Sequence, residues 1–480
     1  MVDFAALDWV VIALFFAGVV GLGFSAKLRE NTSLQMVAAG RALTMPLFVA
    51  TLITTWYGGV LGTPEFYNDF GYGLATLTVN GIPYWIAGLL FAFFLAKRIR
   101  GEPQISIPER IERCYGRIAG LIAALLVTVL ATPAAFVLML GTLLVTVFAG
   151  LDLWAGIAIG GIGCTAFLYR GGLMADARSN TISFVMMYSA FIMILLIAIG
   201  KYGAPWAVIP QLPDAERTWD AGKGIFVVIS WMFVGAWTFV DPGFHQRVAA
   251  VKDEASARRG VLLAVVFWII FDTLTTLTAM YGTIALRGSD PSAMGRMLFP
   301  LFGNQLLPAG MKGVFFAGMF GAIIAATVGY TFVSGTTLSR DFFARLKGEL
   351  SEAAITNYTR ICIAIAALLG IVLAITVNSV VDLWYKVASL VIPGLLVPVV
   401  GAYAFKKPPS AGTAVACLIV PPAIATAWML LASQAVHWEN SIFGTASESE
   451  PAILTPMIVG IIVALLIWGI GSLAERKKRI

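Results

Sequence analysis

Apolar stretches of about twenty residues alternate with short polar connections along the whole chain, and this pattern predicts membrane helices. A helix needs about 20 apolar residues to cross the roughly 30 Å hydrocarbon core of a bilayer. Thirteen stretches are long and apolar enough to do so. The predicted spans are 7–26, 42–62, 73–96, 119–148, 151–168, 179–200, 222–240, 260–286, 311–336, 358–377, 380–404, 411–433 and 452–473.

The composition agrees with the pattern of spans. The chain has 480 residues, of which 59% are hydrophobic and only 12% are charged, whereas a soluble domain has about 25% charged residues. Its mean hydropathy is +0.88. We therefore expect an all-α polytopic membrane protein in which residues 1–480 form one transmembrane domain, with the lipid bilayer as its surroundings.

The basic residues predict how the chain is oriented. Of the 32 Lys and Arg residues, 25 lie in alternate connections and in the C-terminal segment, and only six lie in the connections of the opposite side. Cytoplasmic loops carry the excess of Lys and Arg. The N-terminus is therefore expected outside and the C-terminus in the cytoplasm, in the inner (plasma) membrane. The net charge of +6 reflects this asymmetry, and no nucleic-acid partner is expected.

Few residues favour metal-dependent or nucleophilic catalysis. The four cysteines are far apart, there are two histidines, and no Gly-rich phosphate loop or convincing catalytic triad is present. The spacing gives neither a metal site nor a disulfide framework. We expect no enzymatic activity and no obligate protein partner.

Two of the predicted spans contain helix-weakening residues in mid-membrane. The segment "LITTWYGGVLGTPEFY" has vicinal Gly58 and Gly59, and "WMFVGAWTFVDPGF" has Gly235 and then Pro242. Close helix packing is one interpretation of such glycines. The other is a pair of broken helices, because interrupted segments at corresponding places in two halves are typical of inverted-repeat transporters.

On that interpretation the core consists of five plus five helices, and each repeat begins with a broken helix. The predicted parts are a peripheral helix at 7–26, a first repeat at 42–200, a second repeat at 222–404 and peripheral helices at 411–473.

Four motifs occur in order along this plan: "SIPERIERCYG" at 106–116, "YRGGLMADARSNTISF" at 169–184, "WTFVDPGFHQRVAAVKDEASARRG" at 237–260 and "SRD" at 339–341. In these motifs the chain resembles the sodium:solute symporter family. The resemblance implies a fold of the leucine-transporter type and sodium-driven uptake of a small organic solute.

The resemblance also implies where a sodium ion would bind. Backbone carbonyls of the broken helix map to Thr54 and Tyr57. A neighbouring helix maps to Ala322, with Ala325 and Ala326 at the two positions where relatives carry hydroxyls. A one-residue shift would bring Thr327 to the last position. Because alanine cannot ligate through its side chain, we expect weak sodium binding or none at this locus.

Other polar and aromatic residues are candidates for solute binding, gating or proton transfer. Asp272 lies at the centre of a predicted span, and an acid at that depth is a candidate for function. One interpretation is a proton or cation site. The other is an acid that is hydrogen-bonded within the bundle and serves the structure. The candidates for solute binding or gating are Trp56, Gly58, Gly59, Leu61, Asn80 and Trp237, and the residues expected in a cytoplasmic network are Asp176, Asn180, Asp241 and Arg247.

Together these patterns predict a secondary active transporter that imports a small organic solute by alternating access, with sodium as the coupled ion. A proton-coupled or uncoupled carrier is one alternative, and a transporter-like solute sensor is another. The sequence does not name the solute.

Overall fold

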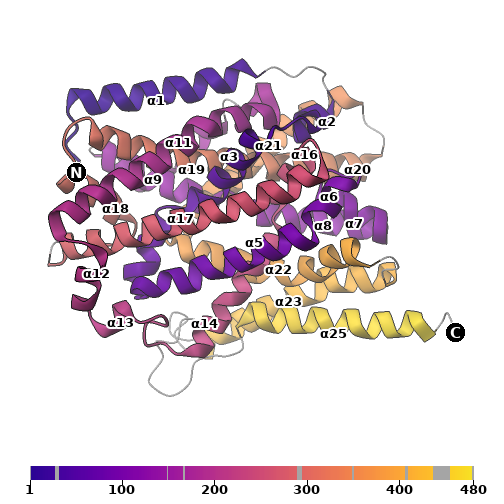
Figure 1. The fold of residues 1–480 in the computed structure, drawn as a ribbon. Coiled ribbons are helices and arrows are strands. Elements are labelled where there is room, and N and C mark those ends of the chain that lie inside the picture. Colours follow the sequence, from indigo (N-terminus) through magenta and orange to yellow (C-terminus); the bar gives the residue numbers. More distant parts are fainter. Residues whose placement is uncertain are drawn as a thin grey trace.

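The computed structural model of the chain is a bundle of α-helices (Figure 1). It describes residues 2–26, 32–148, 150–165, 168–288, 294–348, 351–405, 409–435 and 455–477. Within these residues ten helices are long and apolar enough to cross a membrane, and two bent helix pairs bring the number of spans to twelve. The expected polytopic, all-helical fold is confirmed, whereas the count of thirteen spans is not.

The long helices follow the predicted spans closely. Their bounds are α1 Ala6–Ser25, α5 Ile82–Phe94, α8 Arg117–Leu130, α9 Ala134–Val147, α11 Leu168–Tyr202, α17 Glu254–Leu286, α19 Met311–Thr336, α21 Glu352–Thr376, α22 Val380–Ala404, α23 Ala411–Ala435 and α25 Pro456–Lys477. The predicted span 151–168 corresponds to α10 (Leu153–Thr165), which has only 13 residues. The predicted connection 434–451 lies almost wholly outside the described residues.

The first broken helix lies where the vicinal glycines predicted it. Helix α3 (Met45–Trp56) tightens into the 3₁₀ turn η2 (Tyr57–Gly59), and the chain resumes as α4 (Gly62–Pro64) and the π-helical turn η3 (Glu65–Asp69). The two halves meet at an angle of 42°.

The second broken helix has a different local cause. The helical segments α14 (Ile225–Met232), η7 (Phe233–Ala236) and α15 (Trp237–Val240) are bent by 41° from α16 (Pro242–Ala250). The residue before a proline is disfavoured in the helical region, and Asp241, which precedes Pro242, is extended with φ −65° and ψ 116°. Its carboxylate then caps α16 by accepting a hydrogen bond from the Phe244 N–H at 2.6 Å.

Helix α19 forms the centre of the bundle. It packs against α11, α3, α1, α21 and α9, and nearly all of its residues are buried. Helices α1 and α25 lie on opposite faces of the bundle, and the two chain termini lie at opposite ends of it (Figure 1). The core is therefore built around the helix that the resemblance assigned to the ion site.

Two of the family-like motifs meet at the end of the bundle near α7 (Ile107–Tyr115). Arg340 of the "SRD" segment pairs with Glu109 of the "IPE" segment at 2.5 Å. Partial burial works to raise the pKa of Glu109, but the Arg340 guanidinium and the Ile105 N–H bring it below its usual value. In the motif at 169–184, Gly172 has φ +55° and lies against the Met36 carbonyl, where a Cβ would come within 2.5 Å of the oxygen. The regular part of α11 therefore begins only after Gly172.

Candidate functional site

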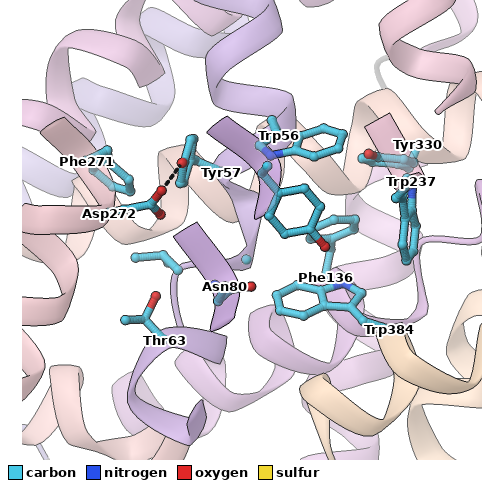
Figure 2. A pocket seen from close by; sticks show the side chains of 13 residues that line it. Trp56, Tyr57, Thr63, Asn80, Phe136, Trp237, Phe271, Asp272, Tyr330 and Trp384 are labelled. Carbon is cyan, nitrogen blue, oxygen red and sulfur yellow. Dashed lines mark hydrogen bonds between the residues drawn. The ribbon is translucent and has the colours of Figure 1, made fainter. Parts of the chain in front are cut away.

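A cavity of about 640 Å³, including the part open to solvent, lies between the two broken helices (Figure 2). Side chains from both breaks and from η5 (Leu77–Gly81), α5, α9, α17, α19 and α22 contribute to it. The residues that line it are Trp56, Tyr57, Gly59, Val60, Thr63, Asn80, Tyr84, Phe136, Trp237, Phe271, Asp272, Tyr330 and Trp384.

Eight of these thirteen residues are aromatic, and several are held by ring contacts. Trp56 stacks on Trp268 with ring centroids 5.5 Å apart, and it meets Tyr84 edge-on at 5.2 Å. Phe136 stacks on Tyr330 at 5.1 Å, with 23° between the ring planes. The walls of the cavity are therefore preorganised ring faces.

Asp272 is the one charged side chain among the described residues that line the cavity. Its Oδ2 atom accepts hydrogen bonds from the Tyr57 hydroxyl and from the Trp85 indole N–H, both at 2.6 Å. Its Oδ1 atom accepts none from any residue that the structure describes. Figure 2 shows Asp272 and Tyr57 on one side of the cavity and Trp237, Tyr330 and Trp384 on the other. The carboxylate is thus fixed by one oxygen, and the other has no hydrogen-bond partner among the described residues.

Several further polar groups of the lining residues have no hydrogen-bond partner within the described parts of the chain. They are the amide of Asn80, the hydroxyls of Thr63 and Tyr84, and the indole N–H groups of Trp56 and Trp384. Groups of this kind fix the orientation of a ligand in an otherwise apolar site.

A second carboxylate lies behind the aromatic wall. The Oδ2 atom of Asp241 accepts hydrogen bonds from the Trp237 indole N–H at 3.1 Å and from the Tyr330 hydroxyl at 2.7 Å. Donation to a carboxylate pushes electron density toward the donor's ring, so these two faces become more attractive to a positive charge.

The helix seam that the resemblance assigned to sodium is closed by direct packing. Gly58 lies so close to α19 that a Cβ built on it would be 2.0 Å from the Ala326 Cβ and 3.1 Å from the Ala322 carbonyl oxygen. Ala325 and Ala326 offer no side-chain oxygen, and the Thr327 hydroxyl donates to the Ile323 carbonyl at 2.8 Å. The Thr54 hydroxyl likewise donates to the Ala50 carbonyl at 3.0 Å. The side chains at this seam do not fit a sodium ion.

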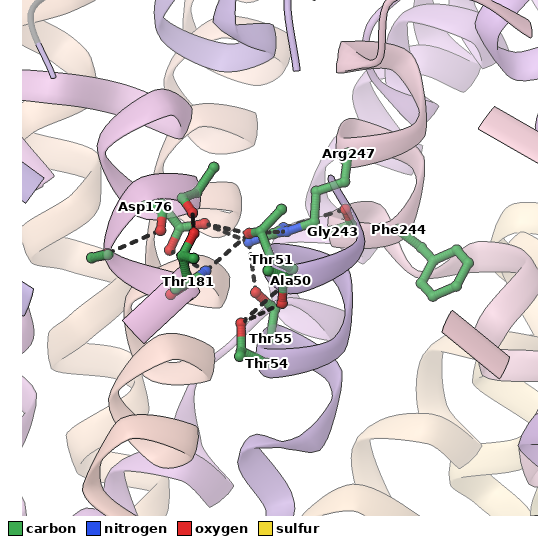
Figure 3. Close-up of polar contacts among 12 residues, drawn as sticks. Ala50, Thr51, Thr54, Thr55, Asp176, Thr181, Gly243, Phe244 and Arg247 are labelled. Carbon is green, nitrogen blue, oxygen red and sulfur yellow. Dashed lines mark hydrogen bonds and ion pairs between the residues drawn. The ribbon is translucent and has the colours of Figure 1, made fainter. Parts of the chain in front are cut away.

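The predicted network forms a buried cluster around Arg247 (Figure 3). Arg247 pairs with Asp176 at 2.7 Å, and both side chains are only 1% exposed. Asn180 donates to Asp176 at 3.1 Å and to Thr51 at 2.9 Å. Asp241 does not join the cluster by a direct bond, because its carboxylate is engaged by Phe244, Trp237 and Tyr330.

Six of the candidate residues therefore lie together in the cavity: Trp56, Tyr57, Gly59, Asn80, Trp237 and Asp272. Gly58 and Leu61 do not line it, since both are buried in the helix packing. Sequence reasoning missed Val60, Thr63, Tyr84, Phe136, Phe271, Tyr330 and Trp384. For Tyr330 a signal existed, because it lies on α19, the helix that the resemblance assigned to the ion site.

An all-helical membrane bundle with two broken helices and a central cavity defines a helical transporter rather than an enzyme or a soluble binding protein. The model of the sodium:solute symporter family matches residues 37–420. The chain belongs to this family, as the four motifs predicted.

Named proteins that resemble this chain in sequence are also transporters. The chain is 24% identical over 393 residues to sodium-coupled monocarboxylate transporter 2 of Danio rerio, covering 75% of this chain and 61% of that protein. It is 25% identical over 440 residues to high-affinity choline transporter 1 of Caenorhabditis elegans, covering 82% and 72%. The sodium/glucose cotransporter of Vibrio parahaemolyticus is 22% identical over 459 residues, covering 85% and 82%. The chain thus spans about three fifths of the length of the zebrafish transporter.

Solved structures show the same fold. A substrate-bound, outward-open Na⁺-coupled sialic acid symporter superposes with a TM-score of 0.78 at 16% identity, covering 98% of this chain and 97% of that one. A nucleobase-cation-symport-1 family transporter in a closed conformation gives a TM-score of 0.53 at 13% identity, covering 92% and 94%.

Proposed function

We propose that this chain is a secondary active symporter whose substrate is a small organic cation. The observation that carries the proposal is the cavity itself, in which a carboxylate with one unbonded oxygen faces a wall of aromatic rings (Figure 2). Quaternary ammonium ligands are recognised by aromatic faces, each worth about 0.5–2 kcal/mol. A buried carboxylate supplies the opposite charge.

The charge of the cavity argues against an anionic substrate. The residues that line it include Asp272 and no Lys or Arg among those described. A monocarboxylate would enter a low-dielectric site with a like charge and no partner, which is costly. Of the three relatives named above, the choline transporter has a substrate of the chemistry that the cavity favours.

We further propose that sodium binds weakly or not at all at the seam formed by Thr54, Tyr57 and Ala322. The packing of Gly58 against Ala326 supports this, as does the lack of a side-chain oxygen at Ala325 and Ala326. Each missing ligand to a charge corresponds to roughly 1.5–3 kcal/mol, or about ten- to a hundredfold in affinity.

The proposed orientation has the N-terminus outside and the C-terminus in the cytoplasm of the plasma membrane. The positions of the termini at opposite ends of the bundle support it (Figure 1), as does the asymmetry of basic residues. The bends in α3–α4 and α14–α16 support the division into repeats 42–200 and 222–404. Ala215→Cys should react with an impermeant thiol reagent in whole cells and Ala255→Cys should not; the reverse result contradicts this topology.

Uptake into proteoliposomes tests the substrate class. The purified chain is assayed with choline, a monocarboxylate, glucose and sialic acid, each with and without a sodium gradient and at fixed membrane potential. Choline or another quaternary ammonium compound should be accumulated, and the anions should not. Accumulation of a monocarboxylate with no uptake of any cation would contradict the proposal.

A further inference from the structure

A second hollow, here called the basic groove, lies where the connection after α5 meets the end of α22. It has a volume of about 1420 Å³, including the part open to solvent, and α6 (Ala96–Gly101), α7 and the last residues of α22 form its walls. The charged side chains that line it are Lys97, Arg98, Arg110, Arg113, Glu102 and Glu254. Four basic and two acidic side chains give the groove a net charge of +2.

Two of the four cations hold the groove together. Arg110 pairs with Glu102 at 2.8 Å, and its Nη2 atom donates to the Ala402 carbonyl at 2.6 Å. Arg98 donates from Nη1 to the Tyr403 carbonyl at 3.3 Å. Both carbonyls belong to the last turn of α22, where backbone oxygens lack partners within the helix and positive charge is favourable. These two arginines therefore tie α6 and α7 to the end of α22.

The other two cations are not used within the described parts of the chain. Lys97 of α6 and Arg113 of α7 are exposed, and neither side chain makes an ion pair or a hydrogen bond with a residue that the structure describes. Both line the same groove. A concave surface lined by charges of one sign attracts ions of the opposite sign, so the groove is suited to an anion.

The groove lies at the level where the membrane helices end, which points to a lipid rather than a soluble anion. Helix α5 ends at Phe94, which is 59% exposed, and Phe405, which lines the groove, is 56% exposed. Backbone hydrogen bonds continue the helix through Leu95, so Phe94 and Arg98, four residues apart, share one face. Aromatic rings and snorkelling cations are typical of the level where acyl chains give way to headgroups.

We infer that the basic groove binds the headgroup of an anionic phospholipid. The phosphate pairs with Lys97 and Arg113, and the acyl chains lie along Phe94 and Phe405. A zwitterionic headgroup is disfavoured, because it brings its own ammonium group to a groove that is already positive. Basic pockets between membrane helices on the cytoplasmic side are suited to anionic headgroups.

The proposed orientation puts this groove on the cytoplasmic side, since α6, α7 and the C-terminus lie at the same end of the bundle (Figure 1). A bound lipid would add a further link between α6, α7 and α22. The inference does not depend on the substrate class, because the experiment below uses no transported solute.

Cys114 reports on the groove in the native chain. It lines the groove and is half-buried, whereas Cys164, Cys362 and Cys417 are buried. Alkylation of Cys114 by a maleimide is followed by mass spectrometry in an uncharged detergent. Added phosphatidylglycerol should slow the reaction in a saturable manner, whereas phosphatidylcholine and sodium phosphate at equal concentration should not. Protection is expressed as the ratio of the rates with and without lipid.

Two double variants separate the groove from general surface charge. Lys97→Gln with Arg113→Gln should weaken protection by phosphatidylglycerol about 25-fold, which is about fivefold, or about 1 kcal/mol, for each basic residue. Lys252→Gln with Arg259→Gln is the matched control, because it removes the same two charges from exposed positions that do not line the groove. The control should keep the native affinity for the lipid.

The substituted residues are exposed and make no bond to the described chain, so the variants should fold. If the double variant cannot be purified, Arg113→Gln alone should lose about fivefold. Equal protection by phosphatidylcholine or by sodium phosphate overturns the inference, and so does an equal loss in the groove variant and the control. None of these results bears on whether an organic cation is transported.

Discussion

The cavity and the Arg247 cluster each contain a buried aspartate, but the two carboxylates are used differently. Asp272 has one oxygen held by Tyr57 and Trp85 and one oxygen without a partner among the described residues. Asp176 has both oxygens engaged, one by Asn180 and the other by Arg247 and Thr51. A carboxylate with an open oxygen beside a cavity is arranged for a ligand that comes and goes. A carboxylate closed by an internal cation is arranged to hold helices together.

The largest effect is expected at Asp272, where a substitution distinguishes a carboxylate that binds a ligand from one that holds helices together. Asp272→Asn keeps the shape of the side chain and removes the charge that a cationic substrate would pair with. Loss of a buried ionic partner costs about 3–5 kcal/mol, so affinity for a quaternary ammonium substrate should fall by at least about a hundredfold. Substrate-dependent shifts in melting temperature and uptake kinetics measure it.

The melting temperature of Asp272→Asn without substrate serves as its control. It should stay near that of the native chain, because the amide oxygen can still accept from Tyr57 and Trp85. Retained affinity for every cation tested, together with an unchanged fold, would place Asp272 with the structural acids and remove the contrast with Asp176.

The second prediction concerns the seam that joins the two regions. Gly58→Ala places a methyl group 2.0 Å from the Ala326 Cβ, so α3 and α19 must separate. Overpacking of this kind costs about 1–3 kcal/mol, and the melting temperature should fall. Gly469→Ala is the matched control, because Gly469 lies in α25 with nothing within 4 Å of its would-be Cβ. Equal effects of the two substitutions would show that the seam is not tightly packed.

A smaller effect is expected from one wall of the cavity. Phe136→Leu keeps an apolar side chain that makes no hydrogen bond and removes one ring face, which is worth about 0.5–2 kcal/mol to a cation. Affinity for a quaternary ammonium compound should fall by roughly two- to thirtyfold, while Phe136→Tyr should retain most of it. If Phe136→Leu weakens a neutral solute as much as a charged one, the ring acts by shape alone and the cation proposal loses support.

The sequence predicted the breaks in the helices better than the lining of the cavity. Vicinal glycines at 58–59 and the Asp241–Pro242 step act through the local backbone, so their effect is visible in a short stretch of sequence. Phe136 and Trp384 reach the same cavity from α9 and α22. Nothing local distinguishes them from other aromatic residues of membrane helices, because their position depends on how distant helices pack.

The predicted network was incomplete for a similar reason. Asp176, Asn180 and Arg247 come together, but Asp241 does not bond to Arg247 directly. The proline that follows Asp241 makes its backbone extended and turns its carboxylate to the Phe244 N–H, which is a capping geometry. The motif placed Asp241 in the network, whereas the local backbone assigns the acid to the helix end and to the Trp237 and Tyr330 donors.

The smallest expected effect comes from restoring one ligand at the seam. Ala325→Ser adds a hydroxyl at a position where relatives are expected to carry one, and it avoids the crowded contact between Ala326 and Gly58. With Ala326 unchanged, one of the two side-chain oxygens is still missing, so the sodium response in thermal unfolding should rise only slightly above that of the native chain. A strong sodium response in Ala325→Ser alone would mean that this one hydroxyl is what excludes sodium, and the seam would then differ from a sodium site by a single ligand.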